Sequence, residues 1–163
     1  MTERAPSSIR LAGLEDAPAL FGLHKDCVRT LCADAYSPLH IDRWFEERTP
    51  DIYAPWLKAG RIWLAETGGE MAGFTGAVAG EITLLFVRPD LAGRGLGRLL
   101  FEFALMRAAE DFDGPITVVA TLNAVPFYQR HGFLAEKETF FERGGLRYPV
   151  VRTRRCLAEA APR

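Results

Sequence analysis

A β-rich run and an apolar helical segment are joined by the loop Ala92-Gly93-Arg94-Gly95-Leu96-Gly97. The run before the loop, Glu81-Ile-Thr-Leu-Leu-Phe-Val87, is typical of a strand, and Pro89 ends it because proline cannot donate to a sheet ladder. After the loop, apolar residues recur at helical spacing until about residue 111. Glycines at alternate positions let the backbone approach a ligand, and the start of a helix offers amides that lack an intrahelical partner. The arrangement predicts an anion site, for which a pyrophosphate is the natural occupant.

Other loops with several glycines fit this sequence less well. A P-loop ends in Gly-Lys-Ser/Thr, whereas Gly97 is followed by Arg98. A dinucleotide-binding loop has the spacing G-x-G-x-x-G early in a βαβ unit, whereas this loop has G-x-G-x-G and lies late in the chain. A plain tight turn needs fewer glycines, so we favour the anion site.

The rest of the chain alternates strand and helix patterns. We expect strands over residues 9–13, 61–67, 71–78, 81–87, 116–121, 133–139 and 148–155. We expect helices over residues 16–31, 37–45, 51–58, 96–111 and 124–131, with Asp16 and Ser37 as N-caps of the first two. No repeat or linker interrupts this order, so residues 1–163 are predicted to form one domain. Its class is α/β (α+β), a mixed, largely antiparallel, twisted sheet of about seven strands flanked by helices on both faces.

Composition and charge exclude several classes of function. The chain has 48% hydrophobic and 25% charged residues and a formal net charge of -1, so we expect no nucleic-acid partner. Cys27, Cys32 and Cys156 show no metal-ligand spacing, which predicts neither disulfides nor a metal. No stretch approaches the roughly 20 apolar residues of a membrane span, and residues 1–10 lack an apolar leader, so we expect a cytoplasmic protein without a membrane partner.

A second motif, Leu122-Asn-Ala-Val-Pro-Phe-Tyr-Gln-Arg-His-Gly-Phe133, follows downstream. Together the two motifs resemble the GCN5-related N-acetyltransferases (GNAT), whose glycine loop is written Gln/Arg-x-x-Gly-x-Gly/Ala. The second signature of that family has an Asn before a helix that carries Phe-Tyr and ends in Gly-Phe. Gly95 and Gly97 match the small positions of the loop, but Ala92 replaces the leading Gln/Arg, so Arg94 or Arg98 would have to supply the missing contact.

The resemblance implies that residues 81–133 bind acetyl-CoA (coenzyme A) as cosubstrate. The pyrophosphate would lie on the glycine loop, at Gly93, Arg94, Gly95, Leu96, Gly97 and Arg98. The pantetheine arm would pair like an extra strand with Leu85, Phe86 and Val87, and Asn123 would hydrogen-bond its amides. By itself, Asn123 is equally well interpreted as a helix N-cap.

The resemblance also implies two catalytic residues. Tyr128 stands where the family keeps the tyrosine that protonates the departing thiolate, although a tyrosine on a helix is otherwise a packing residue. Glu81 is the candidate base, because an amine with pKa 10.4 is neutralised at pH 7 only at a cost of about 4.6 kcal/mol. Strand alternation predicts that Glu81, Thr83 and Leu85 share one face near the thioester, whereas a solvated strand end is the alternative for Glu81.

Residues 16–58 are expected to form the acceptor side, with Tyr36, His40, Trp44 and Thr83 as substrate-binding residues, although packing is the alternative for Trp44. The predicted reaction moves the acetyl group directly, in a ternary complex, onto a primary amine of a small molecule or a protein. Two alternatives stay open, a non-catalytic acyl-CoA-binding sensor and an O-acyltransferase. A homodimer also stays open, because nothing in the sequence decides the oligomeric state.

Overall fold

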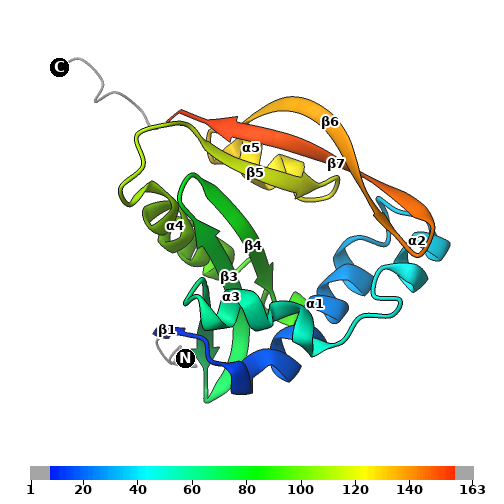
Figure 1. Cartoon of the computed structure of the whole chain (residues 1–163), viewed down its shortest axis with the longest axis horizontal. Coiled ribbons are helices and arrows are strands. Elements are labelled where there is room, and N and C mark those ends of the chain that lie inside the picture. Colours follow the sequence, from blue (N-terminus) through cyan, green and yellow to red (C-terminus); the bar gives the residue numbers. More distant parts are fainter. Residues whose placement is uncertain (1–7, 157–163) are drawn as a thin grey trace.

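The computed structural model describes residues 8–156, so the predictions for residues 1–7 and 157–163 lie outside it. One seven-stranded sheet has the order β1-β2-β3-β4-β5-β7-β6 (Figure 1). The strands are β1 Ser8–Leu11, β2 Ile62–Thr67, β3 Glu70–Val78, β4 Glu81–Val87, β5 Ile116–Thr121, β6 Leu134–Arg143 and β7 Leu146–Arg155. Neighbours are antiparallel except β4 and β5, which are parallel, so the predicted mixed, largely antiparallel sheet is confirmed.

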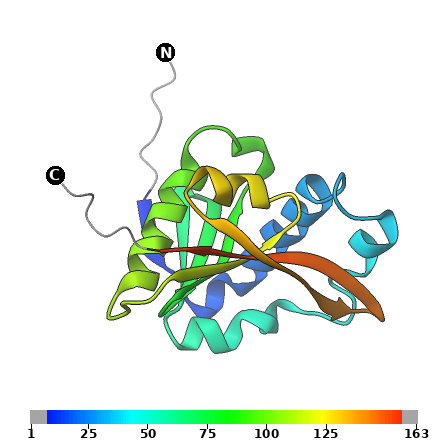
Figure 2. The ribbon, with the colours of Figure 1, turned by 90° about the horizontal axis from the view of Figure 1, so that it is seen from above.

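Helices flank both faces of the sheet, as predicted. They are α1 Ala17–Leu31, α2 Pro38–Arg43, α3 Ala54–Lys58, α4 Leu96–Ala109 and α5 Val125–Arg130, with short 3-10 turns at Leu14–Asp16, Pro50–Tyr53 and Pro89–Leu91. Leu20 of α1 and Leu57 of α3 share an apolar cluster with Phe74 of β3, whereas Leu100 of α4 packs on the opposite face. Figure 2 shows the strands between α4 and α1. Within residues 8–156, no helix is long and apolar enough to cross a membrane.

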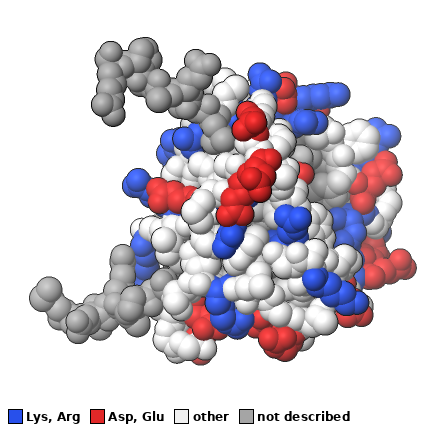
Figure 3. Space-filling model, turned by 60° about the vertical axis from the view of Figure 1, so that its left-hand side comes forward, with Lys and Arg blue, Asp and Glu red and all other residues white. Residues whose placement is uncertain are grey.

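The surface carries charges of both signs. On the face that Figure 3 shows, acidic and basic side chains lie interspersed and form no continuous basic field. This distribution agrees with the near-neutral net charge of -1.

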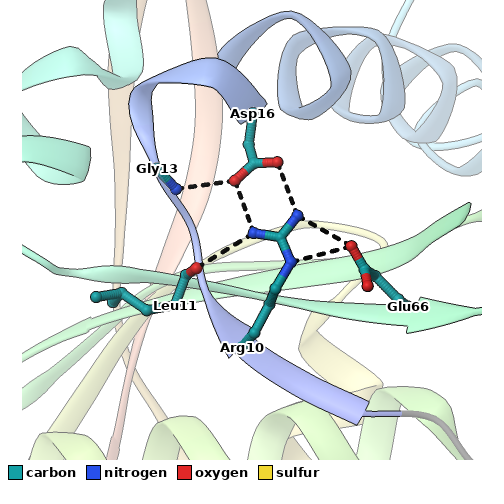
Figure 4. A network of polar contacts seen from close by, with 5 residues as sticks. All are labelled: Arg10, Leu11, Gly13, Asp16 and Glu66. Carbon is teal, nitrogen blue, oxygen red and sulfur yellow. Dashed lines mark hydrogen bonds and ion pairs between the residues drawn. The ribbon is translucent and has the colours of Figure 1, made fainter. Parts of the chain in front are cut away.

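The start of α1 differs from the prediction. The carboxylate of Asp16 does not cap α1; it accepts from the Gly13 amide at 2.8 Å and from the Arg10 guanidinium at 2.9 Å (Figure 4). Arg10 also pairs with Glu66 of β2 at 2.9 Å, and its hydrogen bonds to Asp16 lower the pKa of that carboxyl group. A 3-10 turn precedes α1 and directs the Asp16 side chain back toward Gly13 and Arg10. Asp16 therefore links the start of α1 to the edge strand β1. The predicted cap Ser37 is confirmed, since its hydroxyl accepts from the His40 amide at 3.2 Å.

The β6–β7 hairpin is longer than expected. β5 pairs only with residues 150–155 of β7, so the distal part of the hairpin projects beyond β5 toward α2 (Figure 1). There Tyr148 packs into an apolar cluster with Tyr36 and Trp44. The sequence pattern missed residues 140–147 because charged residues and Gly144-Gly145 interrupt the apolar alternation there.

Candidate active site

A cavity of about 420 Å³ lies at the open ends of β4 and β5. The two strands pair only at Glu81 and Thr117 and then diverge (Figure 1). The cavity is lined by Cys27, Leu31, Cys32, Leu85, Phe86, Val87, Ala92, Gly93, Gly97, Thr121, Asn123, Ala124, Phe127, Tyr128 and Arg130. The structure therefore brings the glycine loop, the end of β4 and the second sequence motif together around one hollow.

The backbone of β4 turns unpaired groups toward this hollow. The Arg88 amide donates to the Ala72 carbonyl at 2.8 Å, which fixes the hydrogen-bonding alternation of β4 against β3. Residues at alternate positions of an antiparallel pair point their amides and carbonyls away from the partner strand. Phe86 therefore bonds to β3, while the amides of Leu85 and Val87 face the gap toward β5. A ligand with amide groups can pair with them as an added strand would.

The glycine loop requires glycine for its backbone conformation. Gly93 and Gly95 have φ values of +77° and +86°, and a Cβ placed on either would meet no atom within 4 Å. Left-handed φ values disfavour other residues even where space is free. Gly95 directly precedes α4, whose first-turn amides have no intrahelical partner. The loop thus presents backbone donors and a positive helix end beside the cavity.

Four predicted loop residues do not line the cavity: Arg94, Gly95, Leu96 and Arg98. Leu96 is buried against Leu100, and the Arg98 guanidinium is bound to Glu102 at 2.9 Å. Arg94 is exposed.

Tyr128 lies in the cavity wall and is buried. Its ring packs against Phe101, Phe127 and Phe133. Among residues 8–156, no side chain or backbone group hydrogen-bonds its hydroxyl. Burial raises the pKa of the phenol well above its ordinary value, so the hydroxyl stays protonated at neutral pH. The residue is a buried proton donor at a cavity wall with no protein acceptor.

Asn123 does not cap the following helix, because Ala124 occupies the N-cap position of α5. Its side-chain oxygen instead accepts from the Cys32 thiol at 3.3 Å. Cys27 donates in the same way to the carbonyl of Val87 at 3.1 Å. Burial raises the pKa of Cys27 to about 12 and that of Cys32 to about 11, which keeps both thiols protonated as donors.

A bulge in β4 changes the predicted face of Glu81. Gly76 pairs with Leu84 and Ala77 with Ile82, so Thr83 is an extra residue. Side chains before and after a bulge lose their alternation. Ile82 packs on the α4 face and Leu84 on the α1 face, which places Glu81 on the α1 face.

Thr83 also lies on the α1 face, because a Cβ on Gly76 would meet both its hydroxyl and the Leu84 side chain. Leu85 packs on the α4 face, so the expectation that it shares a face with Glu81 and Thr83 is wrong. Neither Glu81 nor Thr83 lines the cavity. The Thr83 hydroxyl is buried without a partner among the described residues.

Three of the predicted substrate-binding residues lie close to one another but do not line the cavity: Tyr36, His40 and Trp44. Tyr36 donates to the Pro149 carbonyl at 2.6 Å and accepts from the Leu122 amide at 3.1 Å. The two ring nitrogens of His40 lie 2.6 Å from the Ser37 hydroxyl and 2.9 Å from the Arg147 carbonyl. These contacts tie α2 to the hairpin and to the loop before Asn123.

Several cavity residues were not predicted from the sequence. Phe127 and Arg130 stand in the second motif, and their helical spacing from Ala124 is a signal that could have found them. Cys27 and Cys32 carry no such signal, since only the docking of α1 on β4 brings them to the cavity. Within residues 8–156, no three metal-ligating side chains are grouped to hold an ion.

Comparison with known proteins identifies relatives of this chain. The model of the acetyltransferase (GNAT) domain matches residues 32–150. An uncharacterised N-acetyltransferase, YafP of Escherichia coli, is 28% identical over 103 residues, which cover 63% of this chain and 65% of that protein. The chain thus matches less than two thirds of the length of YafP. The peptidyl-lysine N-acetyltransferase YjaB of Salmonella typhimurium is 31% identical over 104 residues, covering 62% of this chain and 69% of that protein.

Solved structures share the fold. A GCN5-related N-acetyltransferase from Rhodopseudomonas palustris superposes with a TM-score of 0.83 at 22% identity, covering 96% of this chain and 99% of that one. The acetyltransferase yncA of Salmonella typhimurium, solved with acetyl-CoA, has a TM-score of 0.68 at 18% identity and covers 98% of each chain. At these identities the likeness shows the fold.

Proposed function

The chain belongs to the acetyltransferase (GNAT) domain family, and from this membership we propose that it transfers the acetyl group of acetyl-CoA to a primary amine. One observation carries the proposal. The cavity joins the glycine loop at the start of α4 to the gap between two parallel strands, where the amides of Leu85 and Val87 have no partner in β3. Residues 81–133 are then the acetyl-CoA site, and residues 16–58 form the acceptor side.

Acetyl-CoA fits this arrangement by its chemistry. Its pantetheine arm carries two amides, which match the unpaired backbone groups of β4 as an added strand does. Its pyrophosphate is an anion, which suits the amides of Gly93 to Gly97 and the positive end of α4. Asn123, oriented by the Cys32 thiol, offers its amide nitrogen to a carbonyl of the arm.

The described residues also supply a proton donor for the leaving group. In direct transfer the amine nitrogen bonds to the thioester carbon, the carbon–sulfur bond breaks, and the sulfur takes a proton. We propose Tyr128 as the donor of that proton, because its protonated hydroxyl lies at the cavity wall and has no protein acceptor among the described residues. The Leu85 amide, which faces the gap, can donate to the thioester oxygen as negative charge develops on it.

Glu81 is proposed as the base that takes the amine proton. The bulge at Thr83 places its carboxylate on the α1 face of the sheet, opposite α4 and the glycine loop. The acceptor would therefore approach from the α1 side of the sheet, near the point where Glu81 of β4 pairs with Thr117 of β5. The unpartnered hydroxyl of Thr83 lies on the same face and could bind the acceptor or the water that relays the proton.

A panel of acceptors tests the proposal. The chain is incubated with acetyl-CoA and with small primary amines, lysine-containing peptides or matched alcohols, and both the released CoA thiol and the acetylated product are measured. We expect acetylation of an amine. Lysine-containing peptides are the acceptors to test first, because the relative YjaB is named a peptidyl-lysine N-acetyltransferase. Acetyl-CoA binding without transfer to any amine would refute the proposal in favour of a sensor. Acetylation of alcohols alone would refute it in favour of an O-acyltransferase.

A further inference from the structure

The glycine loop lacks one side-chain contact that the resemblance leads us to expect. Ala92 occupies the position of the leading Gln/Arg, and its methyl group lines the cavity without a charge. Of the two nearby arginines, Arg98 is bound to Glu102 at 2.9 Å, and Arg94 does not line the cavity. The glycine loop therefore offers backbone donors but no free cation to the hollow.

Arg130, at the end of α5, is the one arginine in the cavity lining among residues 8–156. It borders the same hollow as Ala92, Gly93 and Gly97. Among residues 8–156, its side chain makes no hydrogen bond, ion pair or ring contact. Its guanidinium is exposed and free to bind a ligand.

Three guanidiniums and one carboxylate act on His131, the residue after Arg130. Burial, followed by the guanidiniums of Arg98 and Arg130, lowers the pKa of His131, the Glu102 carboxylate opposes this shift, and Arg155 adds a smaller lowering effect. Arg98 and Arg155 are held by protein acceptors, Glu102 and the His131 carbonyl at 3.0 Å. Arg130 is the member of this group that keeps its donors available.

We propose that Arg130 binds the pyrophosphate of coenzyme A and so takes the place of the side chain that Ala92 lacks. The inference rests on the proposed function. A guanidinium presents a planar pair of donors that matches two phosphate oxygens, and the glycine loop, which lines the same cavity, supplies backbone amides. The phosphates are then held between two elements, α5 and the start of α4.

A helix-end role is the competing explanation, because a cation in the last turn interacts favourably with the helix dipole. Arg29 provides a matched control, since it is also an exposed arginine in the last turn of a helix and does not line the cavity. Arg130→Gln and Arg29→Gln therefore each remove one positive charge from the last turn of a helix.

The test is calorimetric titration of the wild type, Arg130→Gln, Arg130→Lys and Arg29→Gln with coenzyme A, 3′-dephospho-CoA and pantetheine. Arg130→Gln should weaken coenzyme A and dephospho-CoA by the same factor, about 10- to 100-fold, because both carry the pyrophosphate. Pantetheine affinity should not change. Arg130→Lys should recover part of the loss, and Arg29→Gln should bind all three ligands as the wild type does.

Several results would overturn the inference. Unchanged coenzyme A affinity in Arg130→Gln would show that Arg130 does not bind the phosphates. A loss with coenzyme A but not with dephospho-CoA would assign it to the 3′-phosphate, and an equal loss with pantetheine would show general damage to the cavity. A wild-type chain that binds none of the ligands would refute the proposed function together with this inference.

Discussion

The cavity region (residues 81–98 and 121–133) and the aromatic region (residues 35–45 and 140–150) differ in whether their polar groups have hydrogen-bond partners in the protein. In the aromatic region the Tyr36 hydroxyl both donates and accepts, and Tyr148 donates to the His40 carbonyl at 2.8 Å. In the cavity region the Tyr128 hydroxyl has no protein partner among the described residues, and the Leu85 amide faces a gap. A polar group without a partner costs free energy in a folded protein, so such groups are expected where a ligand completes them.

The contacts of the two regions indicate different roles, catalysis for the cavity region and structural support for the aromatic region. Tyr36, His40 and Trp44 were predicted to bind substrate, and their contacts hold α2, the hairpin and the Leu122 loop in place. We therefore expect substitutions in the cavity region to change activity more than stability, and substitutions in the aromatic region to do the reverse. Three variants test this contrast.

Tyr128→Phe should have the largest effect on activity. Because it removes only a hydroxyl without a protein partner, the free energy of unfolding should stay within about 0.5 kcal/mol of the wild type. Loss of a positioned acid should lower kcat by about 10²- to 10⁴-fold, with little change in acetyl-CoA affinity. The loss should shrink with an acyl donor whose thiol is more acidic. Wild-type turnover in this variant would make Tyr128 a packing residue and erase the contrast.

Gly95→Asp should abolish acetyl-CoA binding, measured as the rise in melting temperature that the ligand gives the wild type. The substitution adds a negative charge and a strained left-handed residue at the start of α4. Gly69→Asp is the matched control, since Gly69 has a φ of +81°, equally open surroundings and a place in the distant β2–β3 turn. We expect at least about a 100-fold loss of affinity in Gly95→Asp and none in Gly69→Asp. Equal behaviour of the two variants would remove the loop from the site.

Tyr36→Phe should have the smallest effect on activity and should act on stability instead. It leaves the Leu122 amide and the Pro149 carbonyl without their partner, which should lower the free energy of unfolding by about 1–3 kcal/mol. Denaturant titration measures this loss, and turnover of the folded fraction should stay within a few-fold of the wild type. A stable variant with a raised acceptor KM would instead place Tyr36 in the acceptor site.

Much of the cavity region was predicted from residues that lie close together in the sequence. The bounds of β4 and β5 agree with the prediction, because each is a short run of β-branched and apolar residues closed by a turn or proline. The glycine loop and Tyr128 were also found from contiguous motifs. These features depend on residues close in the chain, which a sequence displays directly.

Features set by distant pairing were missed. The bulge at Thr83 arises from the register of β4 against β3, and no residue type marks it. The aromatic cluster joins Tyr36 to Tyr148, more than a hundred positions away, and the length of the hairpin depends on that packing. Asp16 was predicted to cap α1, but its carboxylate binds the Arg10 guanidinium instead. The local sequence does not show which of these two partners the folded chain places next to Asp16.

Amide hydrogen exchange tests the central claim, that the gap between β4 and β5 receives acetyl-CoA as an added strand. Exchange at Leu85, Phe86 and Val87 is followed by NMR with and without acetyl-CoA. The Leu85 and Val87 amides, which face the gap, should be protected by the ligand, whereas Phe86 is already bonded to β3 and should change little. Saturating acetyl-CoA that leaves exchange at Leu85 and Val87 unchanged would contradict the account.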